Sequence, residues 1–153
     1  MTIFVKNKHT LQIDEFKFHC SIGKKGSTRK KREGDRKTPK GTFKIENLYF
    51  RKDGKEKPST LLKCVEIEES MGWCDDPKSK NYNKLIFYPF NYKSEKLFRK
   101  DNVYDIILVL NYNMYPIKKN KGSAIFIHIS KKNYKKTEGC IAIRKYEMLK
   151  ILK

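Results

Sequence analysis

The longest aliphatic run of the chain, Ile-Ile-Leu-Val-Leu, closes the segment Tyr104–Leu110. It is far shorter than the roughly 20 apolar residues of a membrane-spanning helix. No longer apolar run occurs, so no membrane span is expected. A continuous run of this length is typical of a strand that is buried on both faces. The run therefore predicts a central strand, with further strands on either side.

Other segments alternate apolar with polar residues, the period of a half-buried strand. The expected strands are 2–6, 10–14, 16–22, 43–45, 61–68, 84–90, 123–130 and 140–144. Segment 94–101 predicts one or two helical turns, and the spacing of Tyr146, Leu149 and Leu152 predicts a helix at the end of the chain. A chain of 153 residues without repeats or a linker fits one domain. The prediction is a single, mainly β domain over residues 1–153, a β-sandwich or barrel-like fold with a short C-terminal helix.

The chain carries 36 basic and 17 acidic residues, a net charge of +19. Such a charge favours polyanionic partners: nucleic acid, an anionic membrane surface or an anionic wall polymer. The lysines are scattered, and neither an aromatic stacking motif nor a recognition helix is visible, so nucleic acid is not expected. Residues 1–14 show no signal peptide and suit a first strand, which leaves a cytoplasmic location open.

The cysteines, at positions 20, 64, 74 and 140, have no zinc or redox spacing, and the histidines at 9, 19 and 128 add none. No metal and no cofactor are therefore expected. The first three cysteines are interpreted as buried free thiols.

Two strand-like segments near the end of the chain hold one histidine and one cysteine. In 123–130 the isoleucines point one way and His128 the other, and in 140–144 the isoleucines again oppose Cys140. A hairpin with residue 128 opposite residue 140 would bring their Cβ atoms to about 5 Å. The pattern predicts an antiparallel pair with both residues on one face.

This pair has the residue types of nucleophilic catalysis. A thiolate is the attacking form of cysteine, and a neighbouring imidazole can take its proton and hold the ion pair. Gly139 lets the backbone come close to a substrate, and the backbone amides there are candidates for an oxyanion hole. A backbone carbonyl is the expected partner for the second histidine nitrogen. By residue type alone, a structural histidine and an inert thiol remain the alternative.

The segment His128–Cys140, ending in Thr-Glu-Gly-Cys, resembles the active-site segment of L,D-transpeptidases of the YkuD family. The turn Thr-Pro-Lys-Gly-Thr-Phe is similar to a family turn, and other segments resemble a short single-domain subgroup of α-proteobacterial type. These segments are 31–43, 72–83, 97–113 and 122–129.

The resemblance implies a mostly β catalytic domain in which Cys140 attacks a peptidoglycan stem peptide. D-Ala leaves, a thioester forms, and an amine acceptor resolves it. His128 would be the base and acid, the carbonyl of Ile129 would orient it, and the amides of Gly139 and Cys140 would stabilise the oxyanion. The implied partners are stem peptides or muropeptides, with an anionic wall polymer as a further candidate. The implied location is the cell envelope or periplasm, and no metal or cofactor is implied.

The chain departs from the family pattern at three positions. Glu138 replaces the usual histidine, Ile129 a small residue, and Ala142 an arginine, for which Arg144 is the candidate substitute. The expected substrate contacts are Arg144, Arg32, Asp35, Ser130 and Glu138. The loop that holds Arg32 and Asp35 can equally be a solvated connection, and Trp73 is interpreted as a packing anchor.

Two other functions stay open at this point. The same cysteine could hydrolyse muropeptides as an L,D-carboxypeptidase. The domain could also be non-catalytic and bind wall polymer or nucleic acid through its charge.

Overall fold

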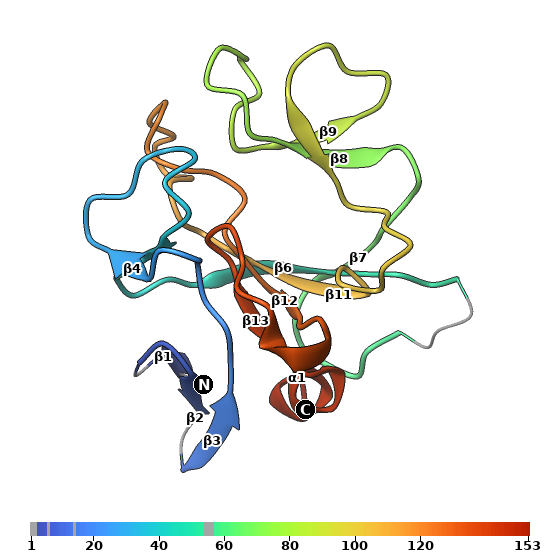
Figure 1. Cartoon of the computed structure of the whole chain (residues 1–153). Coiled ribbons are helices and arrows are strands. Elements are labelled where there is room, and N and C mark those ends of the chain that lie inside the picture. Colours follow the sequence, from blue (N-terminus) through green and yellow to red (C-terminus); the bar gives the residue numbers. More distant parts are fainter. Residues whose placement is uncertain (1–2, 6, 14, 54–56) are drawn as a thin grey trace.

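The computed structural model describes residues 3–5, 7–13, 15–53 and 57–153 and is mainly β (Figure 1). A five-stranded sheet of order β13-β12-β11-β6-β7 lies at its centre, and separate sheets have the orders β1-β2-β3, β10-β8-β9 and β4-β5. The elements are β1 (Ile3–Val5), β2 (Thr10–Ile13), β3 (Phe16–His19), β4 (Ser27–Thr28), β5 (Thr38–Pro39), β6 (Ile45–Phe50), β7 (Cys64–Glu66), β8 (Met71–Cys74), β9 (Leu85–Phe87), β10 (Ser94–Lys96), β11 (Ile106–Leu110), β12 (Phe126–Ile129), the 3₁₀ turn η1 (Lys132–Tyr134), β13 (Ile141–Ile143) and α1 (Lys145–Ile151).

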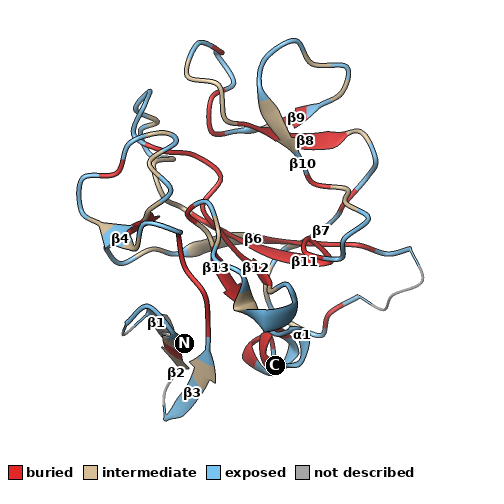
Figure 2. Ribbon diagram, viewed as in Figure 1, coloured by how far each residue is buried: buried red, intermediate tan, exposed pale blue. Residues whose placement is uncertain are grey.

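The aliphatic run Ile106–Leu110 forms β11, the central strand, as predicted. It pairs antiparallel with β12 on one side and with β6 on the other, and all its residues are buried. Its side chains alternate between two apolar clusters, so the sheet is packed on both faces. Figure 2 shows this buried centre in red, with exposed loops around it.

Each face of the central sheet has a different cover. Ile127, Ile129, Ile141 and Ile143 share one cluster with Met148 of α1. The opposite cluster contains residues of β8 and its surroundings, among them Trp73, together with Phe126 and Cys140. The layered arrangement confirms the predicted sandwich-like class, and α1 confirms the terminal helix.

The direction of one strand pair differs from the prediction. β13 runs parallel to β12, with Ile127 beside Ile141 and His128 beside Ala142, so the predicted hairpin is wrong. Segment 130–140 returns the chain to the start of β12. Along this segment, Thr137 forms two backbone hydrogen bonds with residues far away in the sequence: its N–H donates to the carbonyl of Ile22, and its carbonyl accepts from the N–H of Lys24. The isoleucines still share one face, because alternation does not depend on strand direction.

Segment 94–101 also differs from the prediction. Instead of helical turns it contains β10, which pairs antiparallel with β8, Glu95 lying opposite Trp73. Pairing with a neighbouring strand overrides a weak local preference for helix. Among the described residues, no helix has the length and apolar character to cross a membrane.

Candidate active site

His128 and Cys140 lie on the same face of the central sheet, diagonally and not directly opposite each other. Ala142 is the neighbour of His128, and Cys140 lies beside Phe126, whose N–H points to Sγ at 3.4 Å. Strand spacing and rise place such diagonal Cα atoms roughly 8 Å apart. A ring side chain can reach across that diagonal.

The imidazole of His128 is held in one tautomer. Its Nδ1 lies 2.9 Å from the carbonyl oxygen of Ile129, the contact that the sequence led us to expect. A carbonyl can only accept, so Nδ1 carries the proton and Nε2 keeps its lone pair. The ring of Tyr104 packs edge-on at 5.3 Å between centroids. Burial lowers the pKa of His128 to about 4, although the bond to Ile129 opposes the shift. The imidazole is a neutral base at neutral pH.

The thiol of Cys140 is also neutral at rest. Burial raises its pKa to about 12, and the charge of Glu95 adds to the rise, while the N–H of Phe126 and the charge of Lys31 lower it. The thiol donates to the carbonyl of Ala124 at 3.1 Å. The resting pair is therefore thiol and imidazole, and the ion pair expected from the sequence is not its resting form. Proton transfer to His128 has to accompany attack.

The Ala124 carbonyl, which accepts the hydrogen bond from the thiol, belongs to a residue held in place by the buried side-chain amide of Asn83. Ala124 has the left-handed φ of +51°, and its N–H donates to Oδ1 of Asn83 at 3.0 Å. The same Oδ1 accepts from Nε1 of Trp73 at 3.0 Å. Trp73 also packs edge-on against Phe126, with 5.3 Å between ring centroids. Trp73 is thus the expected packing anchor, and through Asn83 it supports the segment that faces the thiol.

The turn before the cysteine is held at its backbone groups by two threonines. Thr137 Oγ1 accepts from the amide of Gly139 at 3.1 Å and donates to the carbonyl of Cys140 at 2.6 Å. Thr38 Oγ1 donates to the carbonyl of Gly139 at 2.8 Å. In this structure the Gly139 amide is therefore bonded to Thr137 and does not point into an open oxyanion hole.

The model of the YkuD family, the L,D-transpeptidase catalytic domain, matches residues 1–153. The chain belongs to the YkuD family. Its members are cysteine-dependent L,D-transpeptidases that act on peptidoglycan stem peptides. No curated protein and no solved structure matched the chain.

Two of the predicted substrate contacts of this YkuD domain come together. Arg144 and Ser130 line a hollow of about 420 Å³ at the C-terminal ends of β12 and β13, where the Arg144 guanidinium lies 5.1 Å from the centre of the Tyr134 ring. Arg144 follows Cys140 by four residues, roughly 13 Å along an extended strand. Arg144 is thus well separated from Cys140 along the chain direction of β13.

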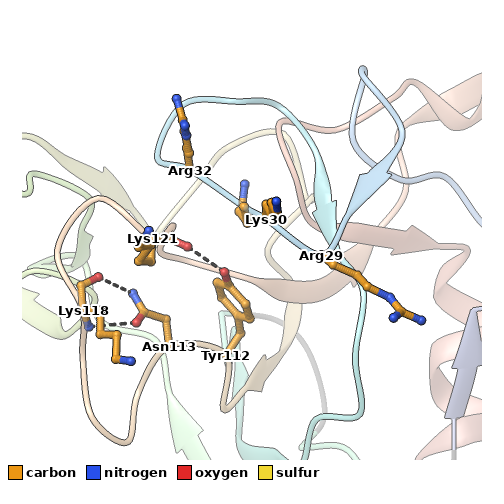
Figure 3. Close-up of a pocket in the computed structure, with 8 residues that line it drawn as sticks. Arg29, Lys30, Arg32, Tyr112, Asn113, Lys118 and Lys121 are labelled. Atoms are coloured by element: carbon orange, nitrogen blue, oxygen red, sulfur yellow. Dashed lines mark hydrogen bonds between the residues drawn. The ribbon is translucent and has the colours of Figure 1, made fainter.

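The other predicted contacts are separated from one another. Arg32 lines a second, strongly basic hollow of about 560 Å³, formed by segments 29–32 and 112–121 (Figure 3). Asp35 is partly buried and binds Lys31 and two backbone amides, so its carboxylate is occupied within its own loop. Glu138 is exposed and pairs with Lys24 and, at 3.1 Å, with Arg36.

Sequence reasoning missed three charged or polar residues near the thiol or the turn that precedes it: Glu95, Lys31 and Thr38. Glu95 accepts from the hydroxyl of Tyr104 at 2.6 Å, and the charge of Glu95 acts on Cys140. Lys31, which the sequence placed in a solvated loop, is buried beside Gly139. Thr38 belongs to the recognised Thr-Pro-Lys-Gly turn, which was the available signal. Among the described residues no three metal-ligating side chains gather at one point.

Proposed function

We propose that the chain is an L,D-transpeptidase whose nucleophile is Cys140. The observation that carries the proposal is the neutral His128, with Nδ1 bonded to Ile129 and Nε2 left as a base, on the same sheet face as the thiol. Sγ attacks the carbonyl that precedes the terminal D-Ala, and its proton passes to Nε2. The C–N bond then breaks, the D-Ala amine takes that proton, and a thioester remains. We place this reaction in the cell envelope, where its substrate lies.

The second half-reaction decides between transfer and hydrolysis. An amine of a second stem peptide attacks the thioester, Nε2 takes its proton, and the proton returns to sulfur. Water in place of the amine would give an L,D-carboxypeptidase. The apolar cluster against which the half-buried thiol packs favours the amine, because an apolar wall excludes part of the water from the reacting carbonyl.

Intact mass after incubation with a carbapenem tests the nucleophile. We expect one adduct on the parent chain and none on Cys140→Ala, because only a thiol activated by a base opens the lactam ring. Cys64→Ala is the matched control, since Cys64 is also a free, half-buried cysteine and lies outside the site. An adduct that persists in Cys140→Ala, or its absence from well-folded parent protein, would contradict the proposal.

The basic hollow supports a wall polymer as a further partner. Apart from the buried Lys31, whose ammonium pairs with Asp35, its charged lining residues are the cations Arg29, Lys30, Arg32, Lys118 and Lys121. Such a surface attracts an anionic chain, and the attraction weakens with salt.

We expect the double variant Lys118→Glu/Lys121→Glu to bind isolated sacculi roughly tenfold more weakly at low salt. The pair Lys17→Glu/Lys153→Glu changes the net charge equally at exposed positions outside the hollow. The measurement is co-sedimentation over a range of salt concentrations. Equal weakening by both pairs, or binding that salt does not affect, would show that the hollow is not a specific site.

A further inference from the structure

Lys31 is the only buried lysine among the described residues. Only 5% of its side chain is exposed, and its Nζ lies 2.7 Å from Oδ1 of Asp35. Asp35 in turn accepts from the backbone amides of Arg32 and Lys37, each at 2.9 Å. Removing two charges from water is costly, and a buried ion pair is often no more stable than apolar residues of similar size. The burial of the Lys31 ammonium beside a partly buried carboxylate therefore calls for an explanation other than stability.

The location of the Lys31 ammonium suggests a role for its burial. The stem of Lys31 runs over Gly122, where an added Cβ would lie 2.8 Å from Lys31 Cε. Its Nζ is 3.4 Å from the position that a Cβ on Gly139 would occupy. Two glycines thus make room for the side chain, and its charged end reaches the residue before the nucleophile.

We infer that the ammonium of Lys31, positioned by Asp35, stabilises the negative charge that develops at Cys140 during attack. This charge forms first on Sγ as its proton moves to His128, and then on the carbonyl oxygen of the bound peptide. The inference rests on the proposed function and adds the residue that supplies the positive charge. A fixed charge in a site from which water is excluded needs no rearrangement during the reaction.

The other charged and titratable groups around the thiol do not supply this charge. Glu95 on β10 is acidic and disfavours a thiolate, and Tyr104, before β11, is held as a neutral phenol by burial and Glu95. His128 on β12 is neutral at rest. Lys31 is the one cation whose charge lowers the pKa of Cys140 among the described residues. Asp35 opposes it in part, since its carboxylate is bound to the same ammonium.

Alkylation of Cys140 by iodoacetamide measures this charge without any substrate. Sulfur displaces iodide, so the rate follows the negative charge available on Sγ. We expect Lys31→Met/Asp35→Asn to slow alkylation roughly tenfold at every pH between about 7 and 9. Asp35→Asn alone leaves the ammonium unbalanced and should accelerate alkylation.

Peptide mass spectrometry separates the reaction of Cys140 from that of Cys64, the internal reference in every sample. Rates at Cys140 that are unchanged, or that fall in both variants, would overturn the inference. If alkylation of Cys64 also becomes faster in the double variant, the fold of that variant has loosened. The test then rests on Asp35→Asn alone, in which faster alkylation of Cys140 supports the inference and slower alkylation contradicts it. Carbapenem acylation of the parent chain tests the proposed function separately. An acylated parent whose variants alkylate at the parent rate would refute the role of Lys31 alone.

Discussion

Replacing His128 with glutamine is expected to lower the rate of Cys140 acylation roughly 100-fold or more. Glutamine can preserve a hydrogen bond to the carbonyl of Ile129, but it offers no base in place of Nε2. The thiol rests protonated, since burial raises its pKa to about 12, so attack without a base depends on a very small thiolate fraction. The measurement is the rate of carbapenem adduct formation followed by intact mass.

The pH profile distinguishes loss of the base from loss of the fold. In the parent chain the pKa of His128 is lowered to about 4, so the base form persists to acidic pH and disappears only as the pH falls through that value. The parent rate should therefore vary little between about pH 6 and 9, whereas the rate of His128→Gln should rise about tenfold per pH unit with the thiolate fraction. A parent rate with that same steep rise would mean that His128 is not the base.

His19→Gln is the matched control for this substitution. His19 lies at the end of β3, is exposed, and stacks on His9 with 5.8 Å between ring centroids. Its ring also packs edge-on against Tyr134, with 4.2 Å between ring centroids, at the hollow that Arg144 lines. Since neither His128 nor Cys140 is its partner, its replacement should leave both the rate of carbapenem acylation and its pH profile unchanged. A comparable loss in His19→Gln would indicate that the assay reports stability instead of chemistry.

The faces of the strands could be predicted from the sequence, but the direction of one pair could not. Alternation alone places the isoleucines of β12 and β13 on one face and Cys140 on the other, in either direction of pairing. Direction depends on the course of segment 130–140, which is fixed by bonds to Ile22 and Lys24. Those partners lie more than a hundred positions earlier in the chain, and no local pattern indicates them.

In the candidate site, too, some features could be predicted from the sequence and others could not. The bond between His128 and Ile129 joins neighbouring residues and could be expected from the sequence. The burial of Lys31 could not, because a charged, glycine-containing loop is normally solvated. It depends on the space above Gly122 and Gly139 and on the carboxylate of Asp35. Local patterns together with the family resemblance indicate His128 and Cys140 as candidate reacting groups, whereas the charged groups around them are brought there by the tertiary packing.

Gly139→Ala is expected to lower the rate of Cys140 acylation by roughly 100-fold, because a small displacement of the nucleophile is enough for such a loss. Gly139 has a φ of +151°, which L residues rarely adopt, and an added Cβ would lie 3.1 Å from the carbonyl oxygen of Lys37 and 3.4 Å from Lys31 Nζ. The loop or the turn has to move, and the bond from Thr38 to the Gly139 carbonyl moves with it. The measurement pairs the acylation rate with the thermal unfolding midpoint.

Gly26→Ala separates backbone strain from this local displacement. Gly26 also has a positive φ, +82°, but an added Cβ would meet only Lys8 Cε, at 3.9 Å. Both variants should lose stability of about 1 kcal/mol from the backbone, and only Gly139→Ala should lose the acylation rate. If the two variants lose rate equally, general strain explains the effect. A Gly139→Ala variant with the parent rate would mean that the packing of the Lys31 loop against this turn does not position the thiol.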